Sequence, residues 1–162
     1  LNNDCLPLRD NYFDSVIQDM EYNNFSMTSC KTVDIKALTR AHIFFFGLWD
    51  IWLSRFNLNP VTKVKRQGWL MTLNLEHYKQ CDFKIPHELK CWFGDDWIAD
   101  QLYKNGFKSA TYRNAIAIHV KGTSSGSKHI KDIIEKDRDT VKNYQIDFEN
   151  GVNAYKRLRW FR

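Results

Sequence analysis

Two hydrophobic periodicities alternate along this chain. Residues 25–33 are rich in strand-forming side chains, and residues 107–120 alternate before they end in the apolar run Ala115–Ile118. Residues 61–73 alternate and then become apolar, which predicts a third strand with a buried far end. Strands separated by helical segments in this order are typical of an α/β fold.

Helical spacing of apolar residues marks the segments between these strands. The predicted helices cover residues 13–20, 34–56, 75–81, 85–92, 95–104 and, after residue 127, two helices broken near Gly151. The pair Asn105-Gly106 predicts a helix stop, because glycine readily adopts the left-handed conformation that closes a helix. Residues 121–127, with two glycines and three serines, predict a loop.

Composition places the chain among globular proteins. Its 162 residues, 43% of them apolar, suffice for one domain with a core. The net charge of +5 favours anionic partners such as nucleotide diphosphates, nucleic acid or an anionic membrane surface, or it serves solubility alone. The four cysteines form no C-x-x-C pair, which indicates a reducing compartment and a cytoplasmic protein. The longest apolar run, Ile43–Trp49, is too short to span a bilayer.

Asp95 and Asp96 follow a glycine and open a predicted helix. Adjacent like charges repel, so the pair requires compensation by solvent, a cation or a proton-transfer role. Stabilisation of the helix dipole is the simpler interpretation, since carboxylates favour a helix N-terminus.

Three other segments contain residues that could bind a metal ion or a substrate. Leu-Asn-Asn-Asp at residues 1–4 offers oxygen ligands that suit Mg²⁺ or Mn²⁺, although it also fits a polar chain end. Gly68 begins the segment Gly-Trp-Leu-Met, where a glycine permits a close backbone approach or simply starts a strand. His119 ends an apolar strand and precedes Lys-Gly-Thr-Ser-Ser-Gly, so it is a metal ligand or a structural histidine.

Taken in order, Leu-Asn-Asn-Asp, Gly-Trp-Leu-Met, Gly-Asp-Asp-Trp and Ile-His-Val-Lys-Gly-Thr-Ser-Ser-Gly resemble the second half of an inverting family-two glycosyltransferase. The resemblance covers residues 1–126 and implies a partial GT-A fold, a mixed sheet flanked by helices without the upstream strands that hold the nucleotide. The first residue is leucine, so we expect a fragment of a longer protein. Residues 1–127 would form the catalytic and acceptor half, and residues 128–162 a C-terminal helical extension.

The resemblance also implies roles for single residues. Asp4 would bind Mn²⁺ or Mg²⁺ together with His119, although Asn2 replaces the first acid of the family's D-x-D motif. Asp96 would be the general base, and Asp95 stands where the family usually has glutamate. The residues expected to bind substrate are Asn3, Gly68, Trp69, Lys121, Thr123 and Ser124. The implied reaction moves a sugar from a nucleotide-diphosphate donor to a saccharide or other hydroxyl acceptor.

Two alternatives come from other classes of protein. Lys63, Lys65, Arg66 and the basic-aromatic tail 155–162 suit a non-enzymatic module that binds nucleic acid or another polyanion. As an enzyme the protein would need no nucleic acid, and the same tail would suit peripheral contact with a membrane. A structural zinc site is the second alternative, because His77 and Cys81, and likewise His87 and Cys91, share a four-residue spacing.

Overall fold

A computed structural model describes part of the chain. The described residues are 5–7, 12–34, 68, 70–119, 128–148 and 151–154. Several predictions lie outside them: most of helix 34–56, the start of strand 61–73, loop 121–127, and the site residues Asn3, Asp4, Trp69, Lys121, Thr123 and Ser124.

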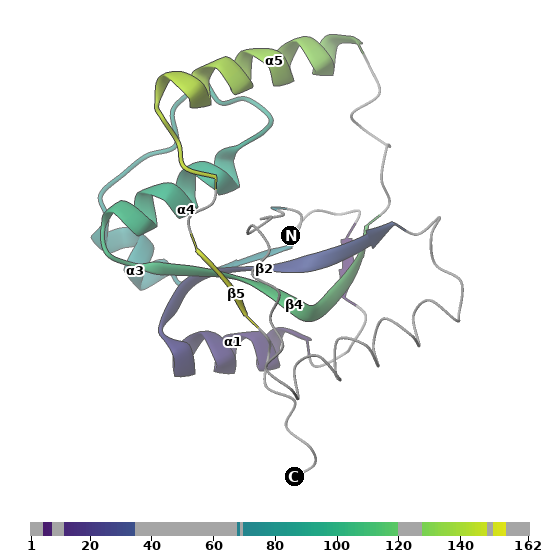
Figure 1. The fold of residues 1–162 in the computed structure, drawn as a ribbon, viewed down its shortest axis with the longest axis vertical. Helices are drawn as coiled ribbons and strands as arrows, with labels where there is room; N and C mark the ends of the chain where they lie inside the picture. Colours follow the sequence, from purple (N-terminus) through teal and green to yellow (C-terminus); the bar gives the residue numbers. More distant parts are fainter. Residues whose placement is uncertain are drawn as a thin grey trace.

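Within the described ranges, five strands form one mixed sheet at the centre of the fold (Figure 1). They are β1 (Cys5–Pro7), β2 (Phe25–Asp34), β3 (Met71–Leu73), β4 (Lys108–His119) and β5 (Val152–Ala154). The strand order is β1-β4-β2-β3, and β5 also pairs with β4. β2 and β5 run parallel to β4, whereas β1 is antiparallel to β4 and β3 is antiparallel to β2. The strands predicted at 25–33 and 107–120 are confirmed.

Helices flank both faces of this sheet. The described helices are α1 (Tyr12–Asn23), α3 (Leu75–Gln80), α4 (Gly94–Lys104) and α5 (Lys128–Asn143). In Figure 1, α1 lies on one side of the sheet, α3 and α4 lie on the other, and α5 lies beyond α4. The predicted α/β class, with a mixed sheet flanked by helices, is therefore confirmed.

Apolar stripes on the helices explain these layers. Tyr12, Val16 and Met20 recur every fourth residue of α1 and pack with Cys30 and Tyr112 of the central strands.

Burial of the Cys30 thiol raises its pKa to about 11. The hydrogen bond with Tyr12 lowers this pKa, and the nearby Cys5 thiol raises it further. All four cysteines are free thiols.

A second core lies under α4. Ile98, Ala99 and Leu102 of this helix pack against Met27 of β2. On its outer side, Trp97 packs against residues of α5 and of the segment after it, Val141 and Ile146. Because α4 is packed on both sides, its position follows from the sheet and from the C-terminal segment together.

The end of α4 follows the predicted stop. Gly106 adopts a left-handed φ of 83°. Its N–H donates to the Tyr103 carbonyl at 2.9 Å, and the Phe107 N–H donates to the Leu102 carbonyl at 2.9 Å. These two bonds satisfy carbonyls that the ending helix leaves without partners. The chain then reverses directly into β4.

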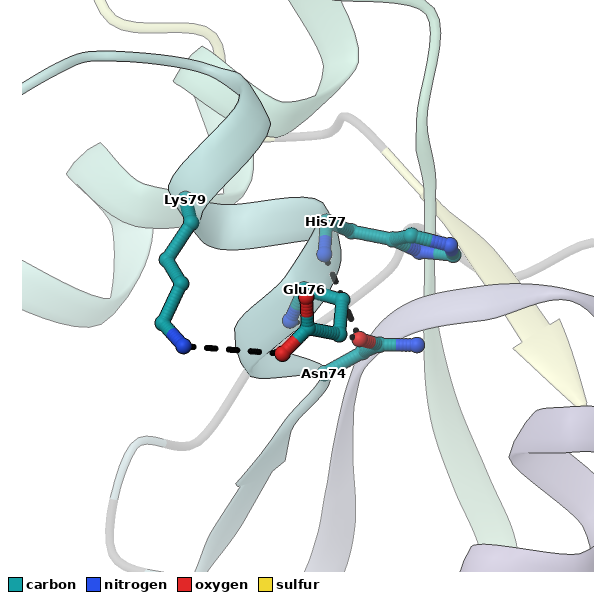
Figure 2. A network of polar contacts seen from close by, with 4 residues as sticks. All are labelled: Asn74, Glu76, His77 and Lys79. Atoms are coloured by element: carbon teal, nitrogen blue, oxygen red, sulfur yellow. Dashed lines mark hydrogen bonds and ion pairs between the residues drawn. The ribbon is translucent and has the colours of Figure 1, made fainter.

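The short helix α3 begins at a side-chain cap, shown in Figure 2. The Asn74 side-chain oxygen accepts hydrogen bonds from the N–H groups of Glu76 at 3.0 Å and His77 at 3.2 Å. Lys79 pairs with Glu76 at 3.5 Å on the exposed face. The cap explains how β3 passes into a helix after one residue.

Two helix predictions are wrong, the second of them over residues 152–154, since residues 155–162 lie outside the described ranges. Residues 85–92 form turns and bends, because a buried carboxylate from α5 binds the amides that a helix would use. After Gly151, whose φ is 120°, the chain forms strand β5. Pairing with β4 supplies backbone hydrogen bonds there, which outweighs the local helical periodicity.

Candidate active site

Asp95 and Asp96 occupy the first turn of α4. The N-cap residue before the helix is Phe93, which has a left-handed φ of 65° and makes no side-chain hydrogen bond to the helix. Both carboxylates are half-buried, and they lie at the end of α4 where the helix dipole favours negative charge. The acidic pair is thus presented by a rigid helix, directly after an unusual backbone turn.

The structure brings Gly68 and Asp95 together. A Cβ atom built on Gly68 would lie 2.6 Å from both Cγ and Oδ2 of Asp95, which is far inside van der Waals contact. The resemblance implied that a substrate approaches the backbone at this glycine, whereas the described group that approaches it is the Asp95 side chain. Two of the four sequence motifs therefore meet at this point.

Gly68→Ala is expected to displace the Asp95 side chain, and because Gly68 is exposed and Asp95 is only half-buried, the free energy of unfolding should fall by less than about 1 kcal/mol. Carbon-13 NMR of the Asp95 carboxyl group and urea unfolding measure the two effects. Gly94→Ala is the matched control, because its added Cβ would meet only Ile85 Cδ1 at 4.0 Å. An unshifted Asp95 signal in Gly68→Ala would contradict the observed contact.

His119 lies at the end of β4 and is 2% exposed. It is opposite Cys5 in β1 and opposite Asp34 in β2. Cys5 directly follows Asp4 in the sequence, so the end of β4 lies beside the strand that the first motif enters. Asp4 itself is outside the described residues.

The described residues do not form a metal centre by themselves. Across the described part of the chain, no group of three or more histidine, cysteine, aspartate and glutamate side chains is placed to hold a metal ion. Asp95, Asp96 and His119 are all among the residues searched.

The alternative zinc site is not formed by the described residues. The His77 Nδ1 lies 2.7 Å from the Ser26 hydroxyl, and the His77 ring stacks on Phe107 with 4.6 Å between centroids. Cys81 donates its S–H to the backbone carbonyl of His77 at 3.2 Å. Residues 87–91 form no helix, so their four-residue spacing does not create a shared face.

Asp137 is the residue near this site that sequence reasoning missed. Its side chain is fully buried in α5 and accepts hydrogen bonds from the N–H groups of Lys90 at 3.0 Å, Cys91 at 2.8 Å and Trp92 at 2.8 Å. Its position was a usable signal, because Ile134, Asp137 and Val141 follow the spacing of a buried helix face.

The ionisation of Asp137 follows from these bonds. Burial opposes the charged form, but the three N–H donors and the nearby Lys90 outweigh it and hold the pKa of this carboxyl below its usual range. A carboxyl with a depressed pKa in the folded state stabilises the fold above its unfolded pKa, near 3.9. That contribution is lost as the pH falls through the lower folded value.

Taken together, the described residues form an α/β protein in which the side chain of Asp95, in the first turn of α4, lies against Gly68. Comparison of the chain with protein-family models, with curated proteins and with solved structures gave no match. Among the helices described, none is long and apolar enough to cross a membrane.

Proposed function

We propose that this protein is a metal-dependent inverting glycosyltransferase with a GT-A fold, or the catalytic and acceptor half of one. The observation that carries the proposal is the pairing of Gly68 with Asp95 at the start of α4. Two motifs that resemble those of family-two enzymes, separated in sequence, meet there in space. The mixed α/β sheet is compatible with the same fold.

The acidic pair supplies the proposed chemistry. Inverting transfer needs a carboxylate that takes the proton from the acceptor hydroxyl while that oxygen attacks the anomeric carbon of the donor. Asp96, in the first turn of α4, is the proposed base. Asp95, whose side chain lies against Gly68, would orient the acceptor or the metal-bound donor.

In this proposal, the nucleotide-sugar donor binds near the end of β4. His119 lies opposite Cys5, the residue that follows Asp4, and the proposed ligands for Mn²⁺ or Mg²⁺ are the Asp4 carboxylate and the His119 imidazole. The bound ion would neutralise charge on the diphosphate leaving group. Asn3, Trp69, Lys121, Thr123 and Ser124 remain the proposed substrate contacts, and the net charge of +5 favours such an anionic donor.

Strands that bind the nucleotide base would precede residue 1 in this proposal. Within the described sheet, β3 is paired with β2. The alternative basic module depends on Lys63, Lys65, Arg66 and residues 155–162. These residues lie outside the described ranges, and no described feature favours that function.

Transfer by the full-length protein is expected to require a divalent cation. Turnover of a nucleotide-diphosphate sugar should disappear with a chelator and return with Mn²⁺, because oxygen ligands and phosphates favour such hard cations. The assay follows sugar transfer from a panel of donors, and NMR of the product reports the anomeric configuration. Retention of configuration, or full activity in the chelator, would refute the proposed mechanism. Tightly bound zinc that is lost in Cys81→Ser would revive the zinc alternative.

A further inference from the structure

Three consecutive amides before the acidic pair converge on Asp137. The N–H groups of residues 90, 91 and 92 all lie within 3.0 Å of its carboxylate oxygens. Hydrogen bonds to an ionised acceptor are shorter and stronger than those between neutral groups. One buried side chain of α5 therefore holds the backbone of residues 90–92 in place.

The next residue is the one that needs support. Phe93 has a left-handed φ of 65°, a conformation that bulky side chains rarely adopt. Such backbone conformations persist where the surrounding structure determines them, and they concentrate at functional sites. The turn at Phe93 directly precedes α4. It therefore sets the direction of the first helical turn, which carries Asp95 and Asp96.

The segment after α5 holds the same helix from its outer side. The Phe93 ring packs against Phe148 with 5.8 Å between centroids, and Trp97 packs against Tyr144 at 4.9 Å. The buried Asp100 carboxylate accepts a hydrogen bond from the Asp147 N–H at 3.3 Å. Residues 137–148 and the sheet thus enclose α4 between them.

We propose that Asp137 is a positioning residue for the acidic pair Asp95 and Asp96, acting through the amides of residues 90–92 and the left-handed turn at Phe93. The inference rests on the proposed function for its catalytic consequence. It makes α5 part of the catalytic unit, although the helix lies beyond the motifs that resemble the glycosyltransferases.

The test compares Asp137→Asn with Asp139→Asn. Asp139 lies on the same helix, but its side chain is 72% exposed and pairs only with Lys142 among the described contacts. Amide hydrogen exchange at residues 90–92 should accelerate roughly ten- to hundred-fold in Asp137→Asn, because these amides lose a charged acceptor. The carboxyl carbon signals of Asp95 and Asp96 should shift as well. Asp139→Asn should change neither measurement.

Steady-state kinetics of the full-length protein supply the catalytic readout. Asp137→Asn should lower kcat by roughly ten- to hundred-fold, since small misplacements of reacting groups are costly, while the donor KM changes little. A role in folding alone would leave kcat per folded molecule unchanged. If Asp137→Asn does not fold, Asp137→Glu keeps the charge and moves it by one methylene. It should then show the faster exchange and the shifted carboxyl signals.

The outcomes separate the two proposals. If the wild-type protein transfers no sugar, the proposed function fails, while the exchange and carboxyl measurements still decide the positioning role. Unchanged exchange at residues 90–92 in a folded Asp137 variant would overturn the inference. Faster exchange with wild-type signals for Asp95 and Asp96 would overturn it too, because the loop would then not position the acidic pair.

Discussion

Asp96→Asn is expected to lower the turnover of the full-length protein by about two to four orders of magnitude, the usual share of general-base catalysis. The amide keeps the shape of the side chain but cannot take the proton from an acceptor hydroxyl. Donor affinity should change little, because the base meets the acceptor and not the diphosphate. Single-turnover transfer measures the first effect, and calorimetric binding of the nucleotide sugar measures the second.

Asp14→Asn is a matched control for this experiment. Asp14 is also a carboxylate in the first turn of a helix, but it is exposed on α1, across the sheet from α4. Its replacement should leave turnover unchanged. Asp4→Asn should instead weaken metal-dependent donor binding. Near-normal transfer by Asp96→Asn would remove this residue from the mechanism and leave its carboxylate as a stabiliser of the helix dipole.

Leu102→Ala is expected to lower the free energy of unfolding by about 2–5 kcal/mol, the range for a large core side chain cut to alanine. Leu102 is fully buried and packs with Met27, Ile98 and Ala99 under α4. Urea unfolding followed by circular dichroism measures the loss.

The neighbouring residue supplies the control for this core substitution. Tyr103 follows Leu102 in α4, yet it is 57% exposed. Tyr103→Ala should therefore cost less than about 1 kcal/mol. Equal losses in the two variants would show that α4 does not lie on the sheet through Leu102.

Local patterns predicted α4 well because its buried faces and its end depend on nearby residues. The three- and four-residue spacing of Trp97, Ile98 and Leu102 marks its buried faces, and the hydrogen bonds around Gly106 close it within one turn. The strand interiors at 25–33 and 107–120 were readable for a similar reason, since buried strands need apolar and β-branched side chains. The candidate acidic pair was visible because adjacent carboxylates are conspicuous in any sequence.

Contacts between distant residues decided the rest. Residues 85–92 have helical periodicity, but Asp137, between 45 and 47 positions further along, takes their amides. Residues 152–154 became a strand because β4 offered an unpaired edge. Among the described residues, the group that lies against Gly68 is the Asp95 side chain, which only folding brings to it. Spacing along a chain encodes which face of an element is buried, whereas the partner that meets that face is chosen by tertiary packing.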